Sequence, residues 1–350
     1  AGGGDSHTFE ADGAIADGDP VALTSAGKVG KAVSGVVADH VEYESGGARY
    51  PHAVYDTYRN RVVVAYRDDD DSDYGKAVVG TVAADSGSGH AVTFASPSTF
   101  ESAGSNWMSI AFVEDSTAAD SRIVIAYRDA GNSNYGTAIV GEVEADNSIT
   151  WGTAVVFESG NTQLISAVYD PDTDRVAVFC QDVGNSGYGT GVVGTVTAGD
   201  NSISFNTGGA TIFNSANSYI WANGATYDTT ANKIVVAYQD DGAGTGEAVV
   251  ATVTGLSTNT IAYGTVQTFN SGGRAAGVAA QYDHTANKTV IAYRDQGNGD
   301  KGTAIVGTVS STDISFGSEV VFHNEDMPSD SVSATYDDHR NKVIITYDKN

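Results

Sequence analysis

A polar pair follows an apolar run at five places in the chain and precedes a turn rich in Gly, Asn or Asp. The pairs are Arg67 and Asp68, Arg128 and Asp129, Gln181 and Asp182, Gln239 and Asp240, and Arg294 and Asp295. An Asp at a strand end accepts hydrogen bonds from turn N–H groups, and an Arg beside it can pair with a neighbouring segment. The pairs therefore suit a repeated structural corner. A ligand-contacting face is the alternative, but a feature that every repeat needs recurs in every repeat, which favours the structural interpretation.

Residues that occur only once are better candidates for binding. Between the repeats lie Asn106 and Trp107, Asn161 and Gln163, Tyr219 and Trp221, Arg274, and residues 323–326. Aromatic rings beside amide and guanidinium groups supply the flat apolar surface and the polar partners that a sugar ring requires. We predict that Trp107, Asn106, Trp221, Tyr219 and Arg274 contact a ligand. The alternative is that Trp107 and Trp221 fill the core between neighbouring sheets.

Motifs of common catalytic sites are absent from the sequence, which has no G-x-S-x-G, no H-E-x-x-H and no P-loop. We therefore predict that the chain is not an enzyme. A polysaccharide-degrading glycosidase or lyase is the alternative, because among 44 acidic residues some pair will always have the carboxylate separation that glycoside hydrolysis needs.

Metal-binding patterns are weak. Asp170, Asp172 and Asp174 begin like a calcium loop, but Arg175 and Gln181 stand where such a loop needs Gly and Glu. The acidic run that starts at Asp68 is typical of a solvated turn. The sequence therefore predicts no cofactor, and Ca²⁺ is the one ion that it leaves open.

Charge and composition exclude several classes of function. The chain has 44 acidic and 18 basic residues, a net charge of −26, and this field repels phosphate backbones and anionic lipids. We expect no nucleic-acid binding and no membrane insertion, since no apolar stretch approaches the length of about 20 residues that a membrane span requires. The only cysteine, Cys180, lies in an apolar run, which indicates a buried structural thiol.

One unit recurs six times along the chain. Its markers are Tyr66, Tyr127, Phe179, Tyr238, Tyr293 and Tyr347, spaced 52 to 61 residues apart. Each full unit contains four short runs of β-branched and aromatic residues between turn residues, with no helical period. Four strands in each of six units predict an all-β chain folded as a six-bladed β-propeller of four-stranded antiparallel blades. A β-sandwich and a β-helix are the alternatives.

The predicted blades form a single domain over residues 1–350. They lie near residues 49–100, 107–157, 164–213, 221–269, 277–322 and 331–348. The last unit supplies only two strands, while the first 47 residues contain two strand-like runs without a partner. We predict that residues 1–47 complete the last blade and close the ring, which would also protect two exposed sheet edges.

The repeats resemble those of β-propeller proteins encoded by bacteriophages, many of them marine. The resemblance rests on units of the type AYRDxGNSxYGTAxVGTV over residues 49–350, and on the opening FEADGAIADGDPVALTSAGKVGKAV, which resembles the start of phage virion and tail-fibre proteins. It implies a virion structural protein that is made in the host cytoplasm and displayed on the virion surface or an extracellular appendage. No catalytic residue is transferred by the resemblance.

These observations predict a non-enzymatic fibre, spike or decoration protein for host attachment, which binds a host-surface glycan or another virion protein. A purely structural capsid or filament subunit is a further alternative. The sequence leaves open the ligand, the binding face, homo-oligomer formation and whether an upstream segment was removed.

Overall fold

The structure is a computed structural model in which two units are distinguished. It describes residues 21–23, 29–31, 41–83, 92–114, 121–205, 209–254, 259–328, 331–338 and 340–348. The first unit comprises residues 1–43 and 81–93, and the second comprises residues 44–80 and 94–350. In the first unit, β1 (Val21–Leu23) pairs with β2 (Val29–Lys31) in antiparallel orientation. The candidate site lies entirely within the second unit.

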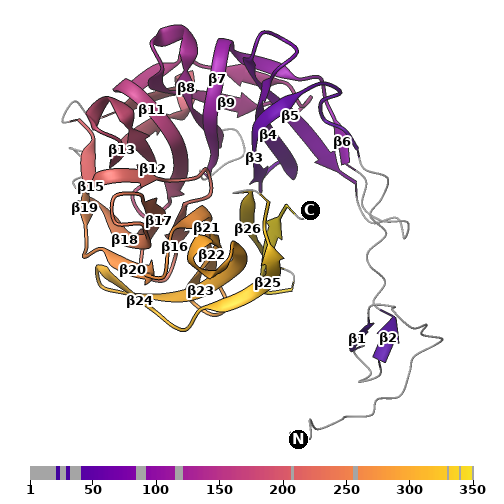
Figure 1. Ribbon diagram of the computed structural model, residues 1–350. Coiled ribbons are helices and arrows are strands. Elements are labelled where there is room, and N and C mark those ends of the chain that lie inside the picture. Colours follow the sequence, from indigo (N-terminus) through magenta and orange to yellow (C-terminus); the bar gives the residue numbers. More distant parts are fainter. Residues whose placement is uncertain are drawn as a thin grey trace, which may run out of the picture. The chain divides into compact units, whose positions relative to one another are not determined.

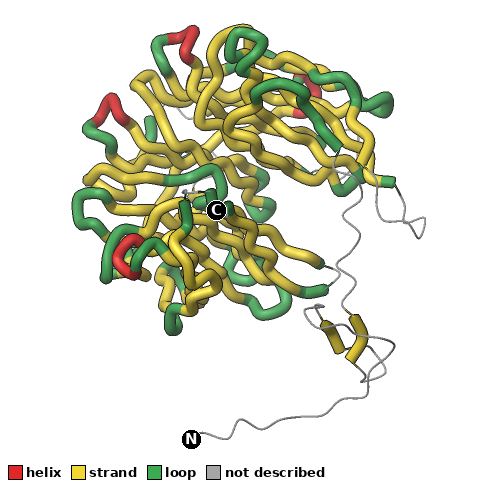
Figure 2. Tube along the Cα trace, turned by 45° about the vertical axis from the view of Figure 1, so that its right-hand side comes forward, coloured by secondary structure: helices red, strands yellow, loops and turns green. Residues whose placement is uncertain are grey.

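Strands dominate the described residues (Figure 2), and the predicted all-β class is confirmed. The strands after β2 are β3 (Ala48–Asp56), β4 (Arg61–Asp68), β5 (Tyr74–Val82), β6 (Val92–Phe94), β7 (Ser98–Val113), β8 (Arg122–Asp129), β9 (Tyr135–Val143), β10 (Ile149–Trp151), β11 (Val155–Asp170), β12 (Arg175–Asp182), β13 (Tyr188–Thr197), β14 (Ser202–Phe205), β15 (Thr211–Tyr219), β16 (Ala225–Asp228), β17 (Lys233–Asp240), β18 (Thr245–Thr254), β19 (Thr260–Tyr263), β20 (Gln267–Asn270), β21 (Ala275–Asp283), β22 (Lys288–Asp295), β23 (Lys301–Ser310), β24 (Asp313–Phe316), β25 (Val320–Asp326), β26 (Val332–Asp337) and β27 (Lys342–Tyr347). Four single turns of 3₁₀-helix are η1 (Ala130–Asn132), η2 (Val183–Asn185), η3 (Ala198–Asp200) and η4 (Gln296–Asn298). None of the helices among the described residues has the length and apolar character needed to cross a membrane.

The strands of the second unit form antiparallel sheets that follow one another in chain order (Figure 1). We number them as sheet I (β3, β4, β5 and the start of β7), sheet II (the end of β7, β8, β9, β10 and the start of β11), sheet III (the end of β11, β12, β13, β14 and the start of β15), sheet IV (the end of β15, β16 to β20), sheet V (β21 to β25) and sheet VI (β26 and β27). The long strands β7 and β11 leave the outer edge of one sheet and become the first strand of the next. Sheets I to V thus show the predicted meander of four strands. The fourth strand can consist of two segments that both pair with the third strand, as β14 and β15 pair with β13 in sheet III.

Sheet VI contains β26 and β27, which pair with each other from Val332↔Tyr347 to Asp337↔Lys342. The partner predicted for it, residues 1–47, falls for the most part outside the described residues. Closure of a six-bladed ring and the single-domain boundaries therefore stay predictions.

In sheets II to V the second strand forms the core because both of its faces are covered. In β8, Ile125 packs in a cluster with Val63 of sheet I, whereas its neighbour Val124 packs in a cluster with Val176 of sheet III. All four side chains are fully buried. The continuous apolar runs of the sequence thus reflect sheets that lie between two other sheets.

The recurrence of tyrosine at one position of the repeats also has a structural explanation. Four of these rings are fully buried, and each hydroxyl donates a hydrogen bond of 2.8 to 3.0 Å to a glutamate: Tyr66 to Glu44, Tyr127 to Glu101, Tyr238 to Glu247 and Tyr293 to Glu319. A buried phenol needs such an acceptor, since an unpaired buried hydroxyl is costly. Phe179 takes this place in sheet III and needs none.

Cys180 is buried, as predicted, with its Sγ 3.3 Å from Thr190 Oγ1. Burial raises the pKa of its thiol to about 12, so that almost no thiolate exists near neutral pH. We expect no labelling by a thiol reagent such as DTNB at pH 8 in the folded chain, and one equivalent in denaturant. Rapid stoichiometric labelling of the folded chain would contradict this burial.

Candidate functional site

The five aspartates of the polar pairs all cap turns. Asp129 Oδ1 accepts a hydrogen bond from the Asn132 amide at 3.1 Å, and Asp182 Oδ1 accepts one from the Asn185 amide at 3.0 Å. Equivalent bonds at Asp68, Asp240 and Asp295 measure 2.9 to 3.1 Å. These buried carboxylates accept hydrogen bonds from the backbone of their own turns.

The residues that precede these aspartates differ in their partners. Arg67 donates to Asn106 of the next sheet and forms an ion pair with Asp69 at 2.7 Å, while Gln181 donates to Asn217 at 2.6 Å. Gln239 donates to Asp241 at 3.2 Å, and Arg294 pairs with Asp300 at 2.9 Å. Arg128 has no ion pair or side-chain hydrogen bond within the described ranges.

The first strand of most sheets contains a kink that positions one side chain at the end of the sheet. Tyr50, Trp107, Leu164 and Gly277 occupy equivalent places, where the strand register shifts, and all have φ between 50° and 59°. A bulky non-Gly residue in this left-handed region is strained, and the surrounding packing must hold it there. The kink thus fixes the backbone that carries Trp107 and Leu164.

These two residues line a pocket of about 940 Å³, which we call the aromatic pocket. Sheets II, III and IV and Ser331 supply its walls, and its lining includes Trp107, Gln163, Leu164, Gln181, Asn217, Tyr219 and Trp221. The rings of Tyr219 and Trp221 are nearly perpendicular, with centroids 6.2 Å apart. Trp107 packs on Tyr50 at a centroid distance of 4.9 Å. The three lining aromatic rings are half-buried, so each keeps surface that a ligand can cover.

The structure brings together three of the five predicted ligand-binding residues, namely Trp107, Tyr219 and Trp221. Asn106 is buried and accepts the hydrogen bond from Arg67, so it does not line the pocket. Arg274 is half-exposed and pairs with Asp241 at 2.8 Å. Asp241 in turn accepts a hydrogen bond from Asn217 at 3.3 Å, so Arg274 reaches the pocket only through these two residues.

The segment that carries Trp221 has an insertion that was not predicted from the sequence. In sheet II, Asn106 and Ile110 are four positions apart and pair with Arg128 and Ile125. In sheet IV, the equivalent residues Tyr219 and Ala225 are six positions apart, although their partners are again three residues apart. The two extra residues push the segment 220–224, which we call the central plug, inward. Comparison of the repeat lengths at this point would have revealed the insertion.

The central plug is hydrogen-bonded to the first strands of the other sheets. The carbonyl of Ala222 accepts from Ser109 Oγ at 3.2 Å and from Ser166 Oγ at 3.0 Å. Asn223 bonds to His52 at 2.5 Å and donates to Ser333 at 2.8 Å, and its carbonyl accepts from the Ala280 amide at 2.8 Å. One short segment of sheet IV thus contacts sheets I, II, III, V and VI.

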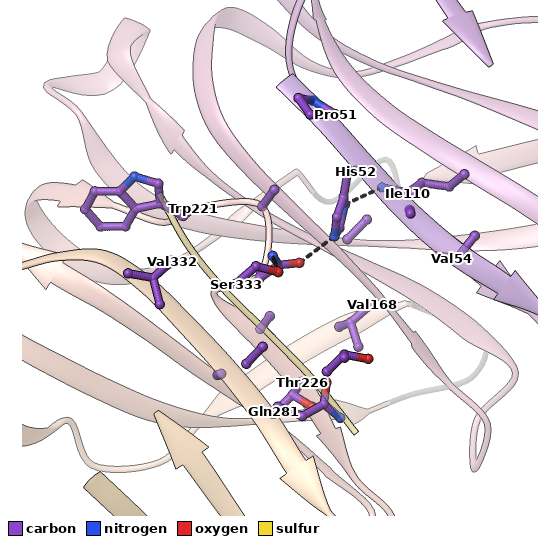
Figure 3. Close-up of a pocket in the computed structure, with 18 of the residues that line it drawn as sticks. Pro51, His52, Val54, Ile110, Val168, Trp221, Thr226, Gln281, Val332 and Ser333 are labelled. Atoms are coloured by element: carbon purple, nitrogen blue, oxygen red, sulfur yellow. Dashed lines mark hydrogen bonds between the residues drawn. The ribbon is translucent and has the colours of Figure 1, made fainter. Parts of the chain in front are cut away.

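Beside the plug lies a central cavity of about 1010 Å³, lined by first strands of all six sheets (Figure 3). His52 projects into it and accepts a hydrogen bond from the Ile110 amide at 3.0 Å through Nδ1. Its Nε2 therefore carries the hydrogen and donates to Asn223. Burial lowers the pKa of His52 to about 4, so the imidazole is neutral at pH 7.

Searches for metal-binding clusters among the described residues, for protein families and for similar curated sequences give no match to this chain. Within the described ranges, no group of three or more His, Cys, Asp or Glu side chains is arranged to hold a metal ion. Asp170, the first residue of the calcium-like run, instead accepts a hydrogen bond from the Asp172 amide at 3.0 Å. No protein-family model matches the chain, and no curated protein matches its sequence.

Several solved structures have a similar chain trace at low sequence identity. A mutant of the Aleuria aurantia lectin in complex with α-methyl-L-fucoside is 13% identical, with 77% of each chain covered and a TM-score of 0.44. The Trypanosoma rangeli sialidase in complex with the inhibitor DANA is 13% identical, with 95% of this chain and 58% of the sialidase covered and a TM-score of 0.48. An exo-β-1,3-galactanase from Phanerochaete chrysosporium is 10% identical, with 86% and 74% covered and a TM-score of 0.37.

The prediction that the chain is not an enzyme is corrected by this comparison. The similar structures include a sialidase and a galactanase as well as a lectin. Missing sequence motifs were the ground for the prediction, and glycoside hydrolysis by a pair of carboxylates needs no contiguous motif. The absence of motifs therefore excludes serine-hydrolase or zinc-protease signatures but does not exclude an enzyme.

Proposed function

We propose that the aromatic pocket binds a saccharide. The observation that carries the proposal is the convergence of three half-buried aromatic side chains, Trp107, Tyr219 and Trp221, with three side-chain amides on one pocket. Aromatic faces cover the C–H surface of a sugar ring, and amides offer both donors and acceptors to its hydroxyl groups.

The polar wall of the pocket is held in place before any ligand arrives. Gln181 is buried and donates to Asn217 Oδ1, and Asn217 donates to Tyr219 Oη at 3.4 Å and to Asp241 at 3.3 Å. Trp107 is fixed by its left-handed backbone and by Tyr50. Groups that are already ordered lose little conformational entropy on binding, which favours affinity for a small ligand.

A glycan array tests the proposal directly. The purified chain, with and without Ca²⁺, would be screened on neutral and acidic glycans, and each bound glycan would then be titrated by following tryptophan fluorescence. The same samples would be checked for newly formed reducing ends, which distinguishes binding from glycoside hydrolysis. No binding to any glycan would overturn the proposal.

Replacement of Trp221 or Trp107 by alanine is expected to weaken saccharide binding tenfold or more, which corresponds to about 1.4 kcal/mol or more. Each replacement removes a ring that stacks on the ligand while leaving the amides in place. The third tryptophan, Trp151, donates to Ser98 Oγ at 2.8 Å and does not line the pocket. The matched control Trp151→Phe is expected to bind normally and to retain the ligand-induced fluorescence change. Unchanged affinity in both alanine variants would contradict the assignment of the pocket.

We further propose that the chain presents this pocket on the surface of a phage particle or its appendage, together with other virion proteins. The resemblance of the repeats and of the first residues to phage proteins supports this proposal. Mass spectrometry of purified particles from a phage that encodes the chain tests it. Absence of the chain from intact particles would contradict it.

A further inference from the structure

Arg128 differs from the other two arginines of the polar pairs in lacking a carboxylate partner. Arg67 pairs with Asp69 at 2.7 Å and with Asp73 at 3.4 Å, and Arg294 pairs with Asp300 at 2.9 Å. Asp73 and Asp300 both stand six residues after their arginine. The residue six positions after Arg128 is Asn134. The repeat that supplies a neutralising carboxylate in sheets I and V thus supplies a neutral amide in sheet II.

The guanidinium of Arg128 is only partly surrounded by polar partners. In the part of the chain that the structure describes, its Nε is buried without a hydrogen-bond partner, and no ion pair reaches its terminal nitrogens. The side chain is half-buried, and burial together with the nearby charge of Arg67 lowers the pKa of Arg128, which Tyr50 partly opposes. An arginine nevertheless stays charged at pH 7. An unpaired positive charge is therefore retained in a chain whose net charge is −26.

Arg128 lies on β8, the strand beside the part of β7 that carries Trp107. It pairs across sheet II with Asn106, whose neighbour in the chain is Trp107. Arg67 lies over the ring of Tyr50 with its Cζ 5.4 Å from the ring centroid, and Tyr50 packs on Trp107. Tyr50 also interacts electrostatically with Arg128, so the ring that packs on Trp107 lies near both arginines.

We propose that Arg128 binds an oxyanion, the carboxylate or sulfate ester of an acidic saccharide whose neighbouring ring occupies the aromatic pocket. The inference rests on the proposed saccharide binding and adds to it a preference for acidic chains. A guanidinium binds such groups through two parallel hydrogen bonds, and these charge-assisted bonds are about twice as strong as neutral ones. At physiological ionic strength the Debye length is about 8 Å, so the ligand experiences the adjacent Arg128 more strongly than the distant acidic surface.

Two variants test the role of Arg128 from opposite directions. Arg128→Gln removes the charge and keeps hydrogen-bonding capacity. Asn134→Asp keeps Arg128 but supplies the carboxylate that sheets I and V possess. The backbone can accept it, since Asn134 has φ 64°, close to the 63° of Asp73 and the 59° of Asp300. Thermal unfolding would confirm that both variants fold.

The probes are trigalacturonate with its methyl ester, and a sulfated galactan tetrasaccharide with its desulfated form, titrated at 150 mM NaCl. We expect the parent chain to bind at least one acidic probe about tenfold more tightly than its neutral match. Both variants should lower affinity for that probe to the neutral level and leave the neutral probe unchanged. The carboxylate and sulfate arms show which group is recognised.

Equal affinity for acidic and neutral probes in the parent chain would overturn the inference, as would an undiminished acidic preference in Asn134→Asp. Failure to bind any of the four probes also counts against it. Failure of the proposed saccharide binding is recognised separately, because it requires that no glycan on the array binds or that neutral binding survives Trp107→Ala and Trp221→Ala.

Discussion

Gly152→Ala is expected to lower the free energy of unfolding by about 3 kcal/mol or more. A Cβ atom at Gly152 would stand 1.7 Å from the carbonyl oxygen of Asn201, a backbone atom of the next sheet. Overpacking by one methyl group costs about 1 to 3 kcal/mol where side chains can move, and more where they cannot. Asn201 cannot move freely, because its side chain accepts a hydrogen bond from the buried Arg122 at 2.5 Å.

Urea unfolding of the parent and variant chains measures this effect. Gly199→Ala is the matched control, because no heavy atom lies within 4 Å of a Cβ at that position, and it is expected to change stability by less than about 1 kcal/mol. Gly264 faces the carbonyl oxygen of Thr312 at the same distance of 1.7 Å, so Gly264→Ala should behave like Gly152→Ala. A loss below about 1 kcal/mol in both variants would contradict the close contact between neighbouring sheets.

The repeats made the strands and their burial predictable from the sequence. The run from Ile123 to Tyr127 contains no alternation of polar and apolar residues, and the structure buries both of its faces between sheets I and III. Asp129 was predictable as a turn cap because its type and position recur in five of the six repeats. Such features depend on local chemistry, which a single sequence displays.

The candidate site was predictable only where residue type alone determined its role. Trp107, Tyr219 and Trp221 all line one pocket: Trp107 lies on β7, Tyr219 ends β15, and Trp221 lies in the central plug. Asn106 has the same sequence context but faces Arg67, a contact between sheets that depends on register. The central plug arises from two extra residues, which alter no motif and appear only when the spacing of the repeats is compared.

The missing partner of Arg128 among the described residues was also not predictable from its motif. Its sequence motif matches those of Arg67 and Arg294, and the difference lies six residues later, at Asn134. Only the ion pairs to Asp73 and Asp300 show what that position does. A repeat protein can thus acquire a binding group by losing one structural partner while keeping the motif.

Lowering the pH below 6.5 is expected to destabilise the chain through His52. The folded state holds this imidazole with a pKa of about 4, whereas the unfolded state has the ordinary value of 6.5. Between these two pH values the unfolded chain binds a proton at His52 that the folded chain does not bind, so the free energy of unfolding falls as the pH falls. The stabilising contribution of the neutral His52 is fully present above pH 6.5. It decreases by about 1.4 kcal/mol for each pH unit below 6.5, and the total loss is about 3 kcal/mol once the pH has dropped through 4.

Urea unfolding of the parent chain and of His52→Gln, at steps from pH 7.5 to pH 4.5, isolates this contribution. Glutamine can accept from the Ile110 amide and donate to Asn223, as the neutral imidazole does, but it does not titrate. Carboxylates titrate in both chains, so the difference between them reports on His52 alone. The difference should grow steadily in favour of His52→Gln as the pH falls below 6.5. A constant difference would contradict the lowered pKa of His52, because it would mean that the folded and the unfolded chain bind this proton equally well.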